Sequence, residues 1–148
     1  MLRYQLYECN TETIPIEKEV EFIKNYIALQ QVRMEESLVI KCWVAPAVAG
    51  FSIAPLLFIS FIENAFKYVS NNDDRENRVE ILLDKHGNDF TCRVFNTKDV
   101  IMPKKLHRGG IGIANAKKRL ELLYPQKHTL HINDAGNTFE VILNLQLT

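Results

Sequence analysis

Two segments in which apolar and polar residues alternate, each interrupted by a short polar turn, limit what this chain can fold into. The first covers residues 79–94 with a turn at 85–89, and the second covers residues 130–145 with a turn at 134–137. Alternation with a period of two buries one face of a strand, and a short turn between two such runs is typical of a β-hairpin. The sequence therefore predicts two hairpins and a mostly antiparallel sheet with one buried face.

Three other segments have the spacing of helices. They are residues 14–35, residues 55–69 and a third segment marked by Ile113, Ala116, Leu120 and Leu123. Pro15 and Pro55 stand at the two helix starts, where proline is favoured, and Pro125 ends the third segment. With a strand at 37–44, the order of elements predicts an α+β fold. We expect a two-layer α/β sandwich, whose mixed, mostly antiparallel sheet is covered on one face by three helices.

The composition indicates a single soluble domain. The chain has 148 residues, of which 47% are hydrophobic and 24% are charged. Eighteen basic residues balance eighteen acidic ones, which argues against a general nucleic-acid binder. Three cysteines lie far apart without a CxxC spacing, which favours reduced thiols in a cytosolic setting over disulfides or a zinc site. Prolines interrupt the longest apolar stretch, residues 44–61, so a membrane-spanning helix is not expected there.

The apolar helix expected at 55–69 contains three strongly polar residues, Glu63, Asn64 and Lys67. Asn64 and Lys67, three residues apart, share one face of that helix. An amide oxygen next to an ammonium suits a site for Mg²⁺ and phosphate, because the oxygen binds the cation and the lysine binds the phosphate. The structural alternative is a surface ion pair between Glu63 and Lys67 together with a hydrogen-bonded buried amide.

Three glycines, Gly109, Gly110 and Gly112, stand at the start of the third expected helix. Free backbone N–H groups at a helix N-terminus favour phosphate, and glycines let a ligand approach the backbone. A flexible loop before an ordinary helix is the structural alternative. Asn96, directly after a predicted strand, could bind the edge of a base or only serve a turn. The four histidines form no metal-ligand pattern.

The order of these motifs resembles sensor histidine kinases. Residues 63–68 (Glu-Asn-Ala-Phe-Lys-Tyr) are similar to their N box, residues 109–112 to their second glycine box, and residues 136–139 (Gly-Asn-Thr-Phe) to the hairpin that closes their catalytic domain. Residues 110–125 and 19–30 resemble the LytS/YehU-like class more specifically. The resemblance covers nearly the whole chain in the correct order.

This resemblance implies a Bergerat-type (GHKL) ATP-binding fold with ATP and Mg²⁺ as ligands. Asn64 would hold Mg²⁺, Lys67 would meet the phosphates, and residues 97–108 would form a lid over ATP. Further contacts to the nucleotide are implied for Tyr68, Asn96, Gly109, Gly110, Gly112 and Thr138. The phosphoacceptor histidine of the class has no counterpart here, so this chain would supply no catalytic nucleophile and would not phosphorylate itself.

The chain departs from the family pattern at two places. The first glycine box of the family is Asp-x-Gly, whose aspartate accepts the adenine amino proton, and the corresponding residues are Asn96, Thr97 and Lys98. A neutral amide forms a weaker hydrogen bond than a carboxylate. ATPases of the superfamily have a general-base glutamate four residues before the metal-binding asparagine, and that position is Ser60. Vigorous ATP hydrolysis is therefore not expected.

The resemblance also implies an organisation and a set of partners. Residues 1–13 would be the tail of the dimerisation and phosphoacceptor region, and residues 14–148 would be the ATP-binding domain. We expect this domain to be cytoplasmic, within a parent protein anchored in the bacterial inner membrane and dimeric when complete. Besides ATP, the expected partners are the phosphoacceptor region of the same protein and a response regulator that binds DNA. This chain itself is not expected to bind nucleic acid directly.

Two other functions remain open on the sequence. The first is a degenerate interaction module that keeps the fold and no longer binds nucleotide. The missing Asp-x-Gly supports it, whereas Asn64, Lys67 and the glycines oppose it. The second is a small protein kinase or switch of the anti-sigma type on the same fold, which the long match to the LytS-like class disfavours.

Overall fold

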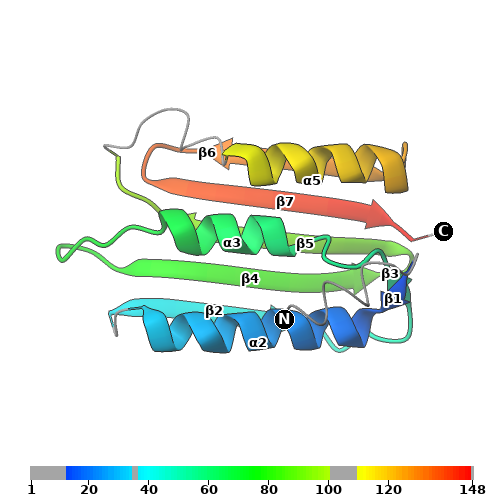
Figure 1. Ribbon diagram of the computed structural model, residues 1–148, viewed down its shortest axis with the longest axis horizontal. Helices are drawn as coiled ribbons and strands as arrows, with labels where there is room; N and C mark the ends of the chain where they lie inside the picture. Colours follow the sequence, from blue (N-terminus) through cyan, green and yellow to red (C-terminus); the bar gives the residue numbers. More distant parts are fainter. Residues whose placement is uncertain (1–12, 35–36, 101–109, 148) are drawn as a thin grey trace.

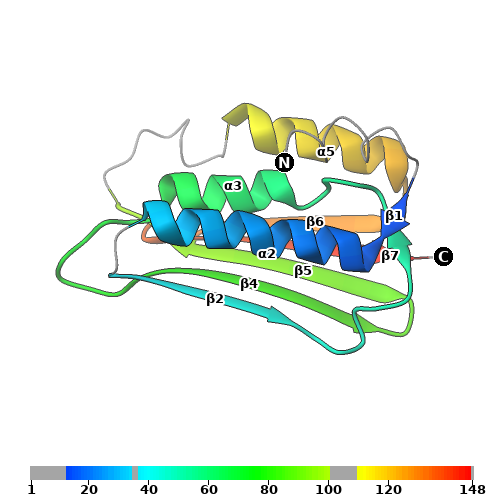
Figure 2. The same cartoon turned by 60° about the horizontal axis from the view of Figure 1, so that its bottom comes forward.

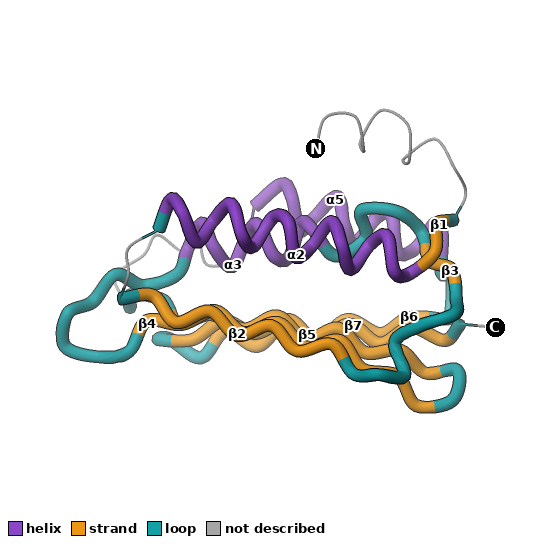
Figure 3. The backbone as a smooth tube through the Cα atoms, turned by 90° about the horizontal axis from the view of Figure 1, so that it is seen from below, coloured by secondary structure: helices purple, strands orange, loops and turns teal. Residues whose placement is uncertain are grey.

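The structure, a computed structural model, describes residues 13–34, 37–100 and 110–147. It has two layers, a five-stranded sheet and three helices that lie on one face of that sheet (Figures 1 and 3). In chain order the described elements are β1 (Ile14–Pro15), α2 (Ile16–Arg33), β2 (Leu38–Val44), β3 (Ser52–Ile53), α3 (Ile59–Tyr68), β4 (Asn77–His86), β5 (Asp89–Thr97), α5 (Gly110–Leu123), β6 (His128–Asp134) and β7 (Thr138–Gln146). The predicted two-layer α+β architecture is confirmed.

The large sheet has the strand order β2-β4-β5-β7-β6. Both predicted hairpins are present, β4 with β5 and β6 with β7, and β5 also pairs with β7 in antiparallel fashion. The sheet is mixed because β2 pairs with β4 in parallel. Parallel neighbours need a crossover connection, and here α3 provides it on the helix-covered face. A separate two-stranded sheet joins β1 to β3.

The alternating residues of the strands form the core, as their spacing predicts. On β4, β5 and β7, every second side chain points toward the helices and is almost fully buried. These residues are Val79, Ile81, Leu83, Phe90, Cys92, Val94, Phe139, Val141, Leu143 and Leu145. The helices contribute the opposite wall of the core. Figures 1 and 2 show α3 lying between α2 and α5, where it can bury apolar side chains on most sides.

Two predicted helix starts were wrong by a few residues, each for a local reason. Helix α3 begins at Ile59, not at Pro55, because Leu56 has φ +56° and this left-handed conformation cannot continue a right-handed helix. Helix α2 begins at Ile16, because Ile14 and Pro15 are extended and pair with β3. Helix α5 ends at Leu123, before Pro125, as predicted.

The lid was predicted to span residues 97–108, and its predicted first residue is too early in the sequence. Thr97 is the last residue of β5, and both Thr97 and Lys98 are buried. Residues 101–108 lie outside the described residues. Separately, none of the helices in the described ranges is long and apolar enough to cross a membrane.

Candidate nucleotide site

Helix α3 carries the N-box-like residues and fixes how they point. Phe61, Ile62, Ala65 and Phe66 are buried and hold the helix in the core. Asn64 lies among them with only 8% of its surface exposed, and its Oδ1 accepts no hydrogen bond from the described part of the chain. A buried amide oxygen without a partner is costly, on the order of 1–3 kcal/mol, so this atom is suited to bind something that the chain itself does not supply.

Lys67 and Tyr68 follow Asn64 at the C-terminal end of α3. Lys67 is exposed, and its ammonium lies 5.3 Å from the centroid of the Tyr68 ring, a cation–π distance. Because Asn64 and Lys67 are three residues apart on one helix, they share a face, as predicted. Glu63 is exposed overall, and partial burial of its carboxyl raises its pKa.

Asn96 lies at the end of β5 on the side of the helices. It continues the inward series of Phe90, Cys92 and Val94, and it is 1% exposed. Its Nδ2 donates a hydrogen bond of 3.0 Å to the carbonyl oxygen of Thr97. A carbonyl can only accept, so this bond fixes the orientation of the amide and directs the Asn96 Oδ1, an acceptor, away from Thr97.

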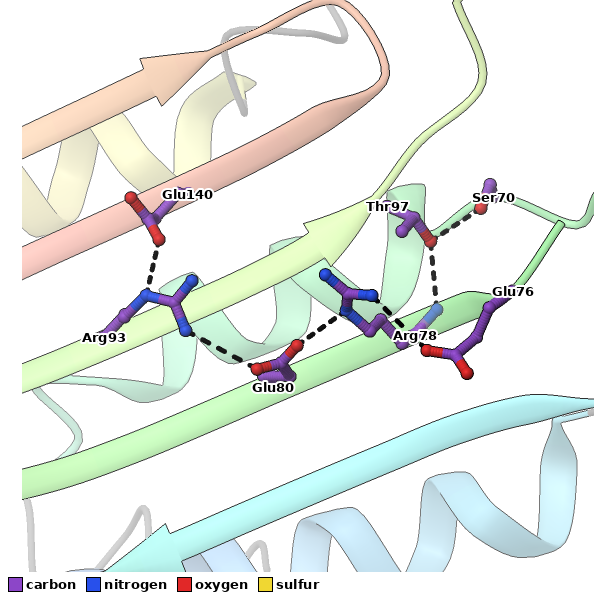
Figure 4. Close-up of polar contacts among 7 residues, drawn as sticks. All are labelled: Ser70, Glu76, Arg78, Glu80, Arg93, Thr97 and Glu140. Carbon is purple, nitrogen blue, oxygen red and sulfur yellow. Dashed lines mark hydrogen bonds and ion pairs between the residues drawn. The ribbon is translucent and has the colours of Figure 1, made fainter.

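A buried network of hydroxyl and amide groups joins the end of α3 to the end of β5. The Ser70 N–H donates to the Thr97 carbonyl over 2.8 Å, and the Ser70 Oγ lies 2.7 Å from the Thr97 Oγ1 and 2.6 Å from the Asn77 Oδ1. The Arg78 N–H donates to the Thr97 Oγ1 over 3.0 Å (Figure 4). The network holds the residue next to Asn96 against the residues that follow α3. No sequence signal indicated Ser70 or Asn77.

The first turn of α5 is the third element of the candidate site. This helix begins at Gly110, at the second glycine motif, and its first N–H groups have no partner within the helix. Gly112 is exposed, and a Cβ placed there would meet no atom of the described chain within 4 Å. Among the described residues, nothing outside this helix therefore crowds the backbone at Gly112. Gly109 lies outside the described residues.

Thr138 does not join this group of residues. It is the first residue of β7 and pairs with Thr97, while its neighbour Phe139 pairs with Asn96 and is buried against the helices. The alternation of β7 therefore places the Thr138 side chain on the face of the sheet that lacks helices. Phe139, not Thr138, lies on the same side as Asn96.

Sequence reasoning also missed a buried lysine at the root of the predicted lid. Lys98 is 1% exposed, and its Nζ lies 2.5 Å from the Oδ1 of Asp134, the last residue of β6. Its N–H donates to the Asn137 carbonyl over 2.9 Å, and Arg75 donates to its carbonyl oxygen. A lysine directly after a strand has no sequence signature that distinguishes it from a solvated one.

The described part of the chain contains no group of three or more His, Cys, Asp or Glu residues placed to hold a metal ion. Mg²⁺ at nucleotide sites commonly takes one or two protein oxygens and completes its shell with phosphate oxygens and water. The Asn64 Oδ1 fits that role because it is a buried oxygen that has no hydrogen-bond partner among the described residues.

Relatives of this chain are sensor kinases. Residues 1–38 match the protein family described as Histidine kinase. Over 139 residues, 88% of this chain, it is 31% identical to the sensor histidine kinase YpdA of Escherichia coli K12, and it covers 24% of that protein. Over 140 residues, 87% of this chain, it is 25% identical to the sensor protein LytS of Staphylococcus haemolyticus, again covering 24% of it. The chain thus spans about a quarter of the length of these curated relatives.

Several solved structures with the same fold are histidine kinases too. The nucleotide-free catalytic domain of ThkA is 12% identical, with a TM-score of 0.61 over 90% of each chain. Full-length ShkA in complex with AMPPNP is 14% identical, with a TM-score of 0.65 over 92% of this chain and 31% of that one. At such identities the likeness concerns the fold alone. Taken with the sequence relatives, it leads to one conclusion: this chain is distantly homologous to the LytS and YpdA sensor histidine kinases and has the fold of histidine kinase catalytic domains.

Proposed function

We propose that this domain binds Mg·ATP between α3, the end of β5 and the first turn of α5. The buried and unpartnered Asn64 Oδ1 is the observation that carries this proposal. In a domain of this size, most buried polar atoms have a hydrogen-bond partner, and exceptions call for an explanation. Coordination of a divalent cation gives this oxygen the partner that the described chain does not provide.

The other polar groups suit the remaining parts of the nucleotide. The exposed Lys67 ammonium supplies positive charge on the same face of α3 as Asn64. The first turn of α5, open at Gly112, offers backbone N–H groups and the positive end of the helix dipole to phosphate oxygens. These two elements pack against each other, so one polyphosphate can contact both.

Asn96 is suited to recognise the base. Its Oδ1 is held as an acceptor at a buried position, because its Nδ2 is already bound to Thr97. An acceptor fits the exocyclic amino group of adenine, whereas guanine has a carbonyl oxygen at the corresponding position. We therefore expect ATP to be preferred over GTP, with a neutral hydrogen bond weaker than a carboxylate would form.

The role of the domain in phosphoryl transfer is to position the nucleotide and to offset its charge. Bound Mg²⁺ neutralises phosphate charge, and such reactions need little covalent chemistry from the protein. Asn64, Lys67 and the α5 turn would orient the terminal phosphate toward a histidine of the dimerisation and phosphoacceptor region. In the complete protein, a homodimer by this proposal, that phosphoryl group would pass to an aspartate of a response regulator. Ser60, four residues before Asn64, supplies no general base for water.

Isothermal titration with a non-hydrolysable ATP analogue, with and without Mg²⁺, tests the proposal. We expect saturable binding that strengthens with Mg²⁺. Asn64→Ala removes the metal ligand and should weaken binding in Mg²⁺ about tenfold, equivalent to ~1.4 kcal/mol. Because the substitution also removes a buried unpartnered oxygen, the free protein should keep or gain thermal stability. Asn25→Ala, at an exposed position of α2, is the matched control.

Two results would contradict the proposal. If the folded wild-type domain binds no analogue up to millimolar concentration, the degenerate interaction module is the better description. If it binds and Asn64→Ala leaves the effect of Mg²⁺ unchanged, the assignment of the metal to Asn64 is wrong. Circular dichroism of each variant at the titration temperature establishes that the comparison concerns folded protein.

A further inference from the structure

The turn that leads into α3 is held by an arginine from α5. The guanidinium of Arg119 donates from Nη2 to the Pro55 carbonyl over 2.9 Å and from Nη1 to the Leu56 carbonyl over 3.1 Å. Two successive carbonyls are thus bound by one planar group. Arg119 is half-buried and comes from a helix more than sixty positions away in the sequence, so the contact joins two separate elements.

Side chains also bind the N–H groups of this turn. The Leu56 N–H donates to the Glu19 carboxylate of α2 over 3.2 Å, and the Ala54 N–H donates to the Tyr124 hydroxyl, directly after α5, over 3.1 Å. Leu56 has φ +56°, a conformation that residues with a side chain rarely adopt. A strained backbone of this kind persists only where its surroundings determine it, and here contacts from both flanking helices do so.

The position of this turn relates it to the candidate nucleotide site. Helices α3 and α5 pack side by side and run in opposite directions (Figure 1). Arg119 follows Gly112 by seven residues, about two helical turns, and Leu56 precedes Asn64 by eight. The contact therefore joins the ends of the two helices that are remote from the groups proposed to meet metal and phosphate.

We propose that Arg119 is a positioning residue that sets the spacing between α3 and α5 for binding of Mg·ATP. This role rests on the proposed function above, because it concerns the same site. In the proposed site, Asn64 on α3 would hold the metal, and the first turn of α5 would hold the phosphates. Fixing the helices at their remote ends keeps the metal ligand and the phosphate-binding turn at one separation.

The chemistry of the side chain explains why arginine stands here. Its planar fork donates two hydrogen bonds in a fixed geometry, and it keeps its charge at every relevant pH. A lysine keeps the charge and most of the length, but its ammonium is a single centre that cannot reproduce the fork. Arg119→Lys should therefore leave the domain folded while it loosens the turn at Leu56 that leads into α3.

The test measures how much Mg²⁺ strengthens binding of the ATP analogue, as the ratio of affinities with and without the metal. A general loss of stability lowers both affinities alike and leaves this ratio unchanged. We expect Arg119→Lys to reduce the ratio at least about fivefold, the lower end of typical couplings between two sites. Arg93→Lys, on the helix-free face, is the matched control and should keep the ratio within about twofold.

A second, milder variant at the same turn keeps the test valid if Arg119→Lys does not fold. Tyr124→Phe removes only the acceptor of the Ala54 N–H, and we expect a smaller reduction of the same ratio. An unchanged ratio in both folded variants would overturn the positioning role and leave Arg119 as a stabilising contact. If the wild-type protein shows no nucleotide binding, the proposed function fails first and this inference with it. If the wild type binds and Asn64→Ala abolishes the metal effect, an unchanged ratio in Arg119→Lys and Tyr124→Phe contradicts this inference alone.

Discussion

Asn96 shows how a single side chain can be prepared for a ligand. Its burial and its bond to the Thr97 carbonyl fix the amide, so that its Oδ1 is available as a neutral acceptor. Asn96→Asp would restore the charged acceptor of the family pattern. We expect tighter binding of the ATP analogue, because charged acceptors form hydrogen bonds about twice as strong. The free domain should lose about 1–3 kcal/mol of stability at neutral pH, because the carboxylate is buried beside a carbonyl oxygen.

The two effects are separable by titration calorimetry and urea unfolding. Asn144→Asp is the control: Asn144 is half-buried on the helix-free face, where it accepts a hydrogen bond from Thr91. That variant should leave nucleotide affinity unchanged. If Asn96→Asp folds and binds the analogue no more tightly than the wild type, Asn96 does not recognise the adenine amino group.

At the scale of elements, the strands could be predicted from the sequence, whereas the polar contacts between elements could not. The alternation in residues 79–94 predicted β4 and β5 because burial on one face leaves a direct trace in the sequence. The start of α3 was predicted too early. The positive φ of Leu56, which delays the helix, depends on partners in α2 and α5 that the local sequence does not reveal. Asn64 could be singled out as a polar residue in an apolar helix, but the absence of a partner for its Oδ1 among the described residues is a property of the assembled core.

An ion pair joins Lys98, directly after β5, to Asp134, the last residue of β6, and its two side chains differ in exposure. The Lys98 side chain is 1% exposed and that of Asp134 is 34% exposed. Asp134→Asn leaves a buried ammonium without its counter-charge, and we expect a loss of about 3 kcal/mol in the free energy of unfolding. Lys98→Met leaves a carboxylate that water can reach, so its cost should stay within about 1 kcal/mol.

Urea unfolding of both variants at neutral pH measures this difference. Equal losses would mean that the pair acts as an ordinary surface contact. A larger loss for Lys98→Met would mean that the packing of the lysine stem, and not its charge, holds the end of β5 in place.

At the scale of the whole molecule, all described helices cover one face of the sheet, and charged residues cross the other (Figure 4). Glu80 on β4 lies 2.6 Å from the Arg78 Nε and 3.7 Å from the Arg93 Nη1, and Arg93 in turn lies 2.5 Å from Glu140 on β7. Both guanidinium groups also lie about 5 Å from the ring of Phe95. This network stabilises the central strands on the face away from α3.

Glu80→Gln should therefore lower stability without affecting nucleotide binding. It weakens two ion pairs, and we expect a loss of about 1 kcal/mol at low salt that shrinks by more than half in 1 M NaCl, where the screening length is about 3 Å. Glu76→Gln is the control, because Glu76 is more exposed and lies 3.4 Å from Arg78. Urea unfolding at two salt concentrations measures the loss. A loss that persists in high salt would assign it to packing and not to charge, and weaker binding of the ATP analogue would show that the two faces of the sheet are coupled.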